Sequence, residues 1–275
     1  MVIPARDAAH SLPAVLAGIG PDVEVVVVDN GSRDATAEVA ERAGARVVRA
    51  PRPHRAAARN LGADAATGDR LLFLDAECVP APGWAAALAG CLDEHELAGG
   101  PVELSTLEPP SALERFDLRW RLHQERHVTE GGWSGGGNLG VRREAFERLG
   151  GFDLWYRAGD DVDFCIRAAG AGMTLGWCPG ARVSHPAART GSELLRRAFR
   201  QGASGTRHYR RLGGRVGRRC WYRPGAAVKG GAALAVLGID DTGLDRSERA
   251  RMARLARLDY AARMAGSLWG DIWPR

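Results

Sequence analysis

Two acidic side chains directly follow a hydrophobic run in this sequence. Residues 71–80 read LLFLDAECVP, so Asp75 and Glu77 stand where a buried strand should end, and a second run, VEVVVVDNGS, leads to Asp29. Ligands of an open parallel sheet bind beyond the carboxyl ends of its strands, so one crevice should gather three carboxylates. Such a crowd is costly unless a cation compensates for it, and Mg²⁺ and Mn²⁺ favour oxygen ligands. The spacing predicts a divalent metal site; the alternative is that Asp75 caps the next helix and Glu77 faces solvent.

Strands and helices must alternate to bring these acids together. We expect strands at Val2–Ile3, VEVVVV, RVVRA and RLLFLDAE, separated by helices over Ala8–Ile19, Ala35–Ala43 and Arg55–Ala66. Unbroken β-branched runs are typical of parallel strands covered on both faces. The alternation predicts an α/β fold with a mostly parallel, doubly wound sheet flanked by helices.

Further elements are expected along the rest of the chain. They are helices at Gly83–Leu92, Leu113–His127, RREAFERLGG and GDDVDFCIRAAGAG, a strand in GGPVELS, and a strand or hairpin in MTLGWCPGARVSHP. From Ser192 we expect a helical, basic extension that is interrupted between Gly202 and Pro224.

The charge of the 275-residue chain is unevenly distributed. Residues 186–275 carry 19 Lys and Arg against 7 Asp and Glu, whereas residues 1–185 carry 19 against 26, and the formal net charge is +5. A basic tail favours an anionic partner such as a phospholipid surface, a phosphorylated acceptor or nucleic acid, and a solvated arginine-rich face is the alternative. Aromatic residues that could stack on bases are few there, so we expect no nucleic acid partner.

Cysteine usage and hydropathy indicate the compartment. The five cysteines are odd in number and form no C-x-x-C pair, which favours free thiols in reducing, cytoplasmic surroundings. The chain opens on a core-like strand, so we expect no signal peptide, although this strand is short enough for the native start to lie upstream. The longest weakly polar run, Gly225–Ile239, is shorter than the about 20 apolar residues that a membrane-spanning helix needs.

Five segments, in this order, resemble family 2 glycosyltransferases with the GT-A fold. They are VIPARD, VVVVDNGSRDAT, RAAARNLGADAATGDRLLFLDAE, GGNLGVRREAFERLGGFD and GDDVDFCIRAAGAG, within the stretch from Val2 to His185. The resemblance implies inverting transfer of a sugar from a nucleoside-diphosphate donor, by default a UDP-sugar, to an acceptor hydroxyl. It also implies a catalytic domain over residues 1–185, with a nucleotide-sugar half (1–100) and an acceptor half (101–185), before a helical extension over 186–275.

The resemblance places the donor nucleotide in the turns after the first two strands. It assigns donor binding there to Pro4, Ala5, Arg6, Asp7, Asp29, Asn30 and Ser32. A carboxylate such as Asp29 can accept the N3–H of uracil or thymine, while Asn30-Gly31 is also an ordinary tight-turn signal. Arg55 and Arg59 lie one helical turn apart, and the family often has a basic residue near the donor phosphates here. The alternative is a surface arginine pair.

The metal motif of the family is D-x-D, and Asp75-Ala76-Glu77 matches it with a departure in the last place. The resemblance assigns Asp75 and Ala76 to the donor, and Asp75 and Glu77 to Mn²⁺ or Mg²⁺. His185 matches a position that supplies another metal ligand in many members, and imidazole is compatible with Mn²⁺. A structural histidine is the alternative.

The acceptor side of the resemblance lies in the second half of the motif set. Gly136-Gly137-Asn138 resembles the acceptor-side loop, where glycines let a sugar approach the backbone. Trp133 could stack on a sugar ring, or could be a core residue.

Two further acids open the helix GDDVDFCIRAAGAG. Asp160-Asp161 resembles the family's E-D motif, which implies Asp161 as the general base and Asp160 as a residue that assists or orients it. Helix capping is the alternative. Asp163 and Arg167, at positions i and i+4, predict a structural ion pair.

The tail and the partners follow from the same reasoning. The segment RSERARMARLARLDYAARMAGSLWG carries an apolar stripe among arginines, so it could contact a membrane surface, cover the catalytic domain or form a homodimer. The acceptor could be a carbohydrate, a lipid-linked molecule or a natural product.

Three other functions compete with the transferase. A sugar-nucleotide pyrophosphorylase would need a glycine-rich phosphate loop that VIPARD lacks. A non-catalytic nucleotide-sugar or glycan-binding module on the same fold would not need the acid pairs. A nucleic acid binder is poorly supported because the basic tail has few aromatic residues.

Overall fold

The structure is a computed structural model that describes residues 1–120, 124–211 and 245–272. The chain divides into two compact units. The first comprises Met1–Glu103 and His123–Pro186, and the second comprises Leu104–Leu122 and Ala187–Arg275.

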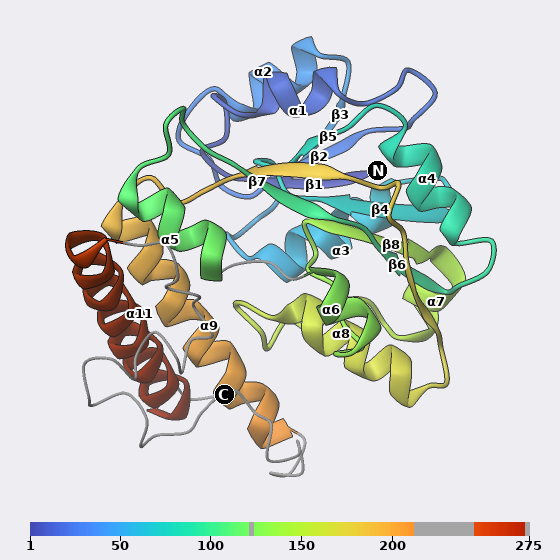
Figure 1. Cartoon of the computed structure of the whole chain (residues 1–275). Coiled ribbons are helices and arrows are strands. Elements are labelled where there is room, and N and C mark those ends of the chain that lie inside the picture. The colour runs from blue at the N-terminus through green and yellow to red at the C-terminus, as the bar shows by residue number, and fades with distance from the viewer. Residues whose placement is uncertain (121–123, 212–244, 273–275) are drawn as a thin grey trace. The chain divides into compact units, whose positions relative to one another are not determined.

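A seven-stranded sheet forms the centre of the first unit (Figure 1). Its order is β3-β2-β1-β4-β8-β6-β9. The strands are β1 (Val2–Ala5), β2 (Val26–Asp29), β3 (Arg46–Arg49), β4 (Arg70–Leu74), β6 (Leu97–Gly99), β8 (Asn138–Arg142) and β9 (Leu175–Trp177). Strands β1 to β4 are parallel where they pair, β8 runs antiparallel to β4 and β6, and β9 is parallel to β6. The predicted α/β fold with a mostly parallel sheet is therefore confirmed.

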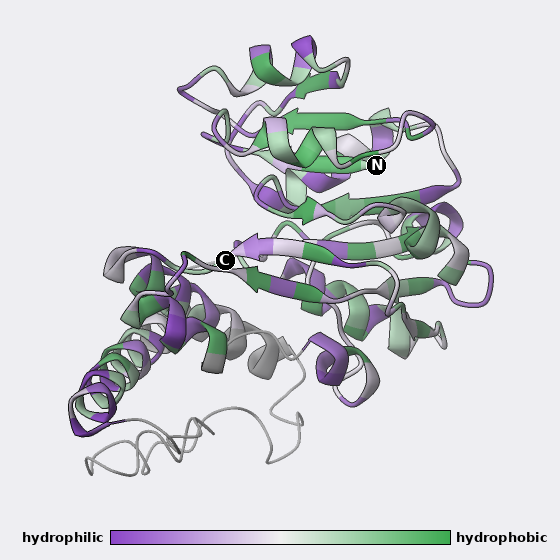
Figure 2. Cartoon of the chain, turned by 45° about the horizontal axis from the view of Figure 1, so that its top comes forward, coloured by the Kyte–Doolittle hydropathy of each residue, from purple (hydrophilic) through white to green (hydrophobic). Residues whose placement is uncertain are grey.

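Helices cover both faces of this sheet. One face packs against α1 (Leu12–Ala17), α2 (Thr36–Arg42) and α4 (Trp84–Cys91), and the other against α3 (Arg55–Ala65), α7 (Arg143–Arg148) and α8 (Asp160–Gly170). Each face has its own hydrophobic core, and successive residues of a strand point to opposite faces. In β1, Ile3 packs into the core with α1, α2 and α4, and Val2 packs into the core with α3, α7 and α8. Figure 2 shows the hydrophobic residues concentrated along the strands, as expected for a sheet buried on both faces.

Shorter elements complete this unit. Helix α6 (Gln124–Thr129) contacts β9. A three-stranded sheet has the order β5-β10-β7, formed by β5 (Val79–Pro80), β10 (Val183–Pro186) and β7 (Val102–Ser105).

The second unit is helical. It contains α5 (Ala112–Trp120), α9 (Gly191–Arg211) and α11 (Arg246–Ile272), with Phe116, Leu194 and Met252 in its core. Asp117 is buried, forms an ion pair with Arg197 and accepts a hydrogen bond from the Ala188 N–H at 2.7 Å. Helix α5 begins with a capping box, in which Glu114 N–H donates to Ser111 Oγ and Ser111 N–H donates to Glu114 Oε2.

Several elements differ from the sequence prediction. Helix α1 begins at Leu12 rather than Ala8, with Pro13 in its first turn, where a proline is tolerated. The predicted helix Leu113–His127 overlaps α5 and α6, and residues 121–123 between these helices lie outside the described residues. The segment MTLGWCPGARVSHP forms no hairpin, since β9 and β10 belong to different sheets.

Other expectations fall on the helices. Helix α9 continues through Gly202 to Arg211, so the predicted interruption does not begin at Gly202, and residues 212–244 lie outside the described part. The Asp163–Arg167 ion pair is confirmed at 2.8 Å. Among the described helices, none combines the length and the apolar character that crossing a bilayer would require.

The prediction that all cysteines are free thiols is wrong for one pair. Cys91 at the end of α4 and Cys178 after β9 form a disulfide, with Cα atoms 6.3 Å apart. Spacing could not reveal the pair, because 87 positions separate the two residues and the fold alone brings them together. Cys78 and Cys165 are buried, and burial raises the pKa of the Cys165 thiol to about 12.

Candidate active site

The loops that follow β1 and β2 are joined by hydrogen bonds. Asp7 N–H donates to Ser32 Oγ at 3.0 Å, and Arg33 N–H donates to Asp7 Oδ1 at 2.7 Å. Asp29 ends β2, and its Oδ1 accepts the Ser32 N–H at 2.9 Å. Asp7 has a positive φ of 50°, which lets the first loop turn toward the second. The structure thus brings together the residues predicted to surround the donor nucleotide.

The remaining predicted nucleotide residues lie along the same edge. Pro4 and Ala5 end β1, and Ala5 is buried. Arg6 is exposed and forms an ion pair in which its Nε lies 3.8 Å from Asp7 Oδ2. Asn30 Oδ1 accepts the His54 N–H at 2.7 Å, which joins the second loop to the start of α3. This hydrogen bond fixes the helix end that carries Arg55.

The two arginines of α3 have different surroundings, although they lie one turn apart. Arg55 is exposed in the first turn. The Arg59 side chain is 1% exposed and donates from Nη1 to Asp160 Oδ2 at 2.6 Å and from Nη2 to Asp75 Oδ1 at 3.1 Å. The alternative of a surface arginine pair is therefore wrong for Arg59.

Asp75 lies at the end of β4, with its side chain 31% exposed. Burial opposes its ionisation, but Arg59, Arg55 and His185 outweigh this effect and hold the pKa of Asp75 below its ordinary value. Asp75 is therefore a carboxylate at neutral pH. Its neighbour Ala76 is buried.

Glu77 and His185 meet across the small sheet. Glu77 Oε2 lies 3.8 Å from His185 Nε2, with side chains 56% and 15% exposed. His185 Nδ1 lies 2.7 Å from the Pro186 carbonyl oxygen, an arrangement that leaves Nε2 directed at Glu77 as a potential ligand atom. A carboxylate and an imidazole fit Mn²⁺, but within the described residues no three such side chains form a ready-made metal cluster.

Asp161 stands in the first turn of α8, whose preceding residue Gly159 has a positive φ of 79°. Its Oδ2 accepts the Gly136 N–H at 2.7 Å and its Oδ1 accepts the Val162 N–H at 2.9 Å. Asp160 beside it is 1% exposed, and burial together with Asp161 raises the pKa of Asp160, against the opposing effect of Arg59. The predicted base and its neighbour thus differ sharply in environment.

The glycine loop before β8 lies against these acids. A Cβ atom on Gly136 would lie 2.5 Å from Arg59 Cζ, and one on Gly137 would lie 3.0 Å from Asp75 Oδ2. Any larger side chain here would have to displace the arginine or the carboxylate. The two predicted loop glycines are therefore required by close approach to the acidic cluster.

Asn138 and Trp133 have packing partners within the protein. Asn138 is fully buried, donates to the carbonyl oxygens of Pro101 and Ala181, and accepts from Trp84 Nε1. Its amide therefore ties three segments together. Trp133 stacks on His127, with ring centroids 4.0 Å apart, and packs partly against the core.

Sequence reasoning missed the role of Arg59 and its neighbour Phe152, whose ring centroid lies 5.4 Å from Arg59 Cζ. An available signal was the position of Arg59 in the middle of the alanine-rich run RAAARNLGADA, since a helix face of alanines packs closely against a sheet.

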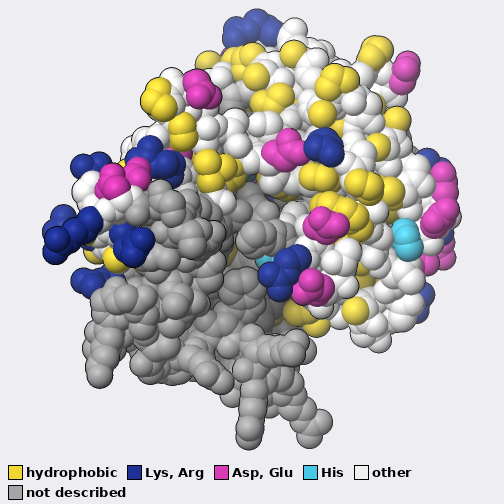
Figure 3. All heavy atoms as spheres, viewed as in Figure 1, with side chains coloured by type: hydrophobic (Ala, Val, Ile, Leu, Met, Phe, Trp, Pro, Cys, Tyr) yellow, Lys and Arg dark blue, Asp and Glu magenta, His cyan; other side chains and the backbone are white. Residues whose placement is uncertain are grey.

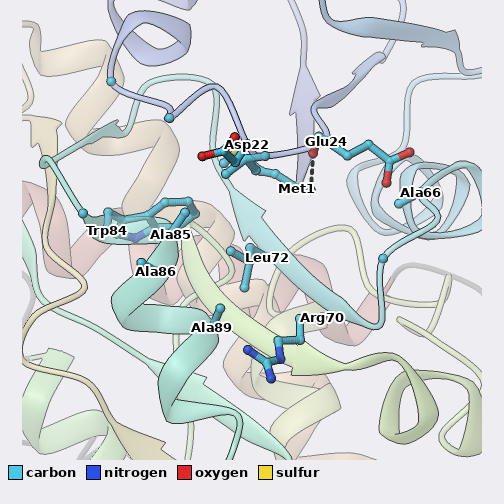
Figure 4. A pocket seen from close by; sticks show the side chains of 15 residues that line it. Met1, Asp22, Glu24, Ala66, Arg70, Leu72, Trp84, Ala85, Ala86 and Ala89 are labelled. Atoms are coloured by element: carbon cyan, nitrogen blue, oxygen red, sulfur yellow. Dashed lines mark hydrogen bonds between the residues drawn. The ribbon is translucent and has the colours of Figure 1, made fainter.

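A cavity of about 400 Å³ lies elsewhere, at the amino-terminal edge of the sheet (Figure 4). Met1, Asp22, Arg70, Leu72 and Trp84 are among its lining residues. None of the residues predicted to bind the donor, the metal or the acceptor lines it.

The class of protein follows from sequence comparison. The family model described as "Glycosyl transferase family 2" matches residues 1–150, and the model "Glycosyl transferase family group 2" matches residues 117–239. Since the first match covers more than half of the chain, the chain belongs to glycosyl transferase family 2.

Named relatives agree with this family. Glycosyltransferase AglE of Haloferax volcanii is 32% identical over 187 residues, which are 65% of this chain and 61% of AglE. The pre-mycofactocin glycosyltransferase of Mycobacterium tuberculosis is 31% identical over 198 residues, which are 67% of this chain and 42% of that protein. The matched region thus spans less than two thirds of the length of these relatives.

Solved structures show the same GT-A fold. The mannosyltransferase PcManGT from Pyrobaculum calidifontis, in complex with GDP-Man and Mn²⁺, has a TM-score of 0.65 at 20% identity and covers 99% of this chain and 87% of its own. Glucosyl-3-phosphoglycerate synthase from Mycobacterium tuberculosis, in complex with Mn²⁺ and UDP-glucose, has a TM-score of 0.52 at 21% identity, with coverages of 88% and 80%.

Proposed function

We propose that this chain is an inverting glycosyltransferase that moves a sugar from a nucleoside-diphosphate donor, with a UDP-sugar as the expected donor, to an acceptor hydroxyl. The observation that carries this proposal is the way in which hydrogen bonds hold the Asp161 carboxylate. Its carboxylate is held by backbone N–H groups of Gly136 and Val162 at a helix start, while the neighbouring Asp160 pairs with Arg59. A carboxylate fixed in this way can accept the proton of the attacking hydroxyl.

The donor nucleotide would lie in the joined loops after β1 and β2. Asp29 uses one carboxylate oxygen for Ser32 and retains acceptor capacity for the N3–H of a pyrimidine base. Pro4, Ala5, Arg6, Asp7 and Asn30 would line this part of the site. Arg55 is the exposed cation beside Asp75 and would contact the diphosphate.

Asp75, Glu77 and His185 would hold a divalent ion, Mn²⁺ or Mg²⁺. The Glu77–His185 pair and the ionised carboxylate of Asp75 support this assignment, as do the Mn²⁺ complexes of the two similar structures. When bound, such an ion neutralises the charge that develops on the leaving diphosphate.

The acceptor would approach from the side of Asp161 and the Gly136-Gly137 loop. A carbohydrate, a lipid-linked molecule or a natural product would each supply the required hydroxyl group. Of residues 1–185, those of the first unit would form the catalytic domain, and α5 would join the helices after residue 186 in an extension.

The extension would contact an anionic phospholipid surface. The exposed residues of α11 include Arg246, Arg251, Arg254 and Arg257, together with Leu258, whose exposed fraction is 46%. Two acids of this helix have arginine partners, because Glu248 pairs with Arg115 and Asp259 with Arg263. Self-association as a homodimer is the competing use of this face.

Donor binding can be tested by thermal unfolding with UDP, dTDP, GDP or CDP, each with Mn²⁺, Mg²⁺ or EDTA. A nucleotide at 100 times its dissociation constant should stabilise the protein by about 2.7 kcal/mol. We expect one nucleotide, UDP by the family default, to raise the unfolding temperature only when metal is present. The Asp75→Ala variant should fold and lose this shift.

The same panel distinguishes the competing function. If no nucleotide shifts the wild-type protein under any metal condition, donor binding has been lost and a non-catalytic glycan-binding module becomes the better account. If a nucleotide binds equally well in EDTA, the metal assignment of Asp75, Glu77 and His185 is wrong.

A further inference from the structure

The deepest charge in the first unit is a cation surrounded by acids. Arg59 contacts Asp160 at 2.6 Å and Asp75 at 3.1 Å, and Asp161 adds to the negative field around it. The two contacted carboxylates lie 85 positions apart in the sequence, at the end of β4 and the start of α8. One guanidinium therefore joins the part of the site predicted to bind donor and metal to the part predicted to carry the base.

The geometry leaves Arg59 no access to a donor molecule. Its side chain is 1% exposed, and both terminal nitrogens already donate to carboxylates. Gly136 packs so closely against the guanidinium that a Cβ atom would lie 2.5 Å from Cζ, and Phe152 covers it at 5.4 Å. A phosphate could reach this group only if the loop or the ion pairs moved.

We propose that Arg59 is a positioning residue, whose buried guanidinium fixes Asp75 and Asp160 in one charge network and does not bind the donor phosphates. This replaces the phosphate-binding role that the family resemblance implied for Arg59, and its kinetic part rests on the proposed function.

The network has two consequences for neighbouring groups. Arg59 occupies Asp75 Oδ1, so the orientation of the whole carboxylate is set from inside the protein. The Gly136 backbone contacts the guanidinium on one side and donates to Asp161 Oδ2 at 2.7 Å on the other. A shift of the Arg59 guanidinium would therefore displace Gly136 and, with it, the hydrogen bond that holds the Asp161 carboxylate.

A first experiment needs no substrate. Unfolding by urea is measured in EDTA for the wild type, Arg59→Met, Asp160→Asn and the double variant. Arg59→Met leaves buried carboxylates without their cation, so its urea midpoint should fall. Adding Asp160→Asn removes one of those charges, so the double variant should recover part of the loss, which is a non-additive result. Strictly additive losses would overturn the proposed network.

A second experiment separates positioning from donor binding. Arg59→Lys keeps the charge but cannot reach both carboxylates with a planar fork. We expect its nucleotide Kd, measured by calorimetry with Mn²⁺, to stay within about threefold of the wild type. Its kcat for donor turnover should fall by about tenfold to a hundredfold, because the base and Asp75 are misplaced.

The matched control is Arg55→Met, one turn earlier on the same helix. Because Arg55 is exposed, this variant should raise the nucleotide Kd by about tenfold and leave the urea midpoint in EDTA unchanged. If Arg59→Lys instead raises Kd as much as Arg55→Met does and leaves kcat intact, Arg59 is a phosphate ligand and the proposal fails. If the wild type binds no nucleotide, the proposed function fails, whereas recovery in the double variant still supports the network.

Discussion

Asp160 and Asp161 are adjacent in the sequence and have opposite surroundings in the structure. Asp160 is 1% exposed and forms an ion pair with a buried guanidinium, whereas Asp161 accepts hydrogen bonds from two backbone N–H groups. Arg59, on one side, and the backbone N–H groups of Gly136 and Val162, on the other, create this difference. The account at this scale therefore depends on the contact between Arg59 and Gly136.

Gly136→Ala tests that contact. The new Cβ atom would lie 2.5 Å from Arg59 Cζ, so the guanidinium or the loop must shift and the Asp161 hydrogen bond must change. We expect donor turnover to fall by at least about tenfold, since small displacements of catalytic groups are costly.

Gly135→Ala is the matched control for this substitution. At Gly135 the nearest atom to a new Cβ would be Gln124 Oε1 at 3.7 Å, an ordinary van der Waals contact. Its turnover should stay near that of the wild type. Equal losses in both variants, measured as nucleotide release, would show that the loop responds to any added methyl group rather than to Arg59.

The sequence was informative about which residue types gather at the site. Strand ends predicted that Asp29 and Asp75 lie at one edge, because parallel strands share their carboxyl ends. The sequence could not predict that Arg59 is buried and Arg55 exposed. That distinction depends on the glycine loop before β8, which closes over the second turn of α3 and is remote in sequence.

Glycines also decide how the helices of the second unit meet. A Cβ atom on Gly202 of α9 would overlap the Arg263 carbonyl oxygen of α11, and one on Gly266 would overlap the Phe199 carbonyl oxygen. The two backbones therefore touch at two points along the helix pair. At these two points the helices pack backbone against backbone.

Gly202→Ala should destabilise the protein, although alanine favours helices. Propensity alone would add up to about 1 kcal/mol of stability, but overpacking against α11 should cost about 1–3 kcal/mol. Gly191→Ala at the start of the same helix has no atom within 4 Å of the new Cβ and serves as the control. Urea unfolding of both variants checks this expectation, and a Gly202→Ala variant as stable as Gly191→Ala would refute the close contact.

Elements with strong hydrophobic patterns were predicted well, and glycine-rich ones were not. Strands β2 and β4 follow from their β-branched and aliphatic runs. Strand β8 was missed because GGNLGVR reads as a loop, yet it pairs with both β4 and β6 in the middle of the sheet. Its Gly140 faces Leu88, where a Cβ atom would lie 3.0 Å from Cγ, so tertiary packing selects glycine in a strand.

At the scale of the whole molecule, the excess of basic residues late in the sequence forms a basic patch on the surface of the second unit. Figure 3 shows Arg side chains gathered over the helical unit, near the start of α11. The sequence predicted the basic character of this region. It could not show which arginines are neutralised by a buried acid, as Arg197 is by Asp117 and Arg263 is by Asp259, because these ion pairs depend on the fold.

Binding to vesicles tests the proposed membrane contact. Replacement of Arg251, Arg254 and Arg257 by Gln should weaken binding to vesicles that contain anionic lipids by about a hundredfold, given about 1 kcal/mol per charge near the surface. Replacement of the exposed Arg42, Arg126 and Arg148 of the first unit is the control for net charge and should have little effect. Sedimentation with vesicles of anionic or neutral lipid provides the readout. Equal weakening by both triple variants would reject a specific face.

The most direct test of the central claim is release of free nucleotide from the nucleotide-sugar donor selected by thermal unfolding. It is measured by chromatography for the wild type and Asp161→Asn, with Mn²⁺ and with EDTA, alongside the nucleotide Kd of each. The account predicts metal-dependent release by the wild type, and an Asp161→Asn variant that binds nucleotide normally but turns over about 10²–10⁴-fold more slowly. Turnover by Asp161→Asn at the wild-type rate would contradict it, because the base would then have to be another residue.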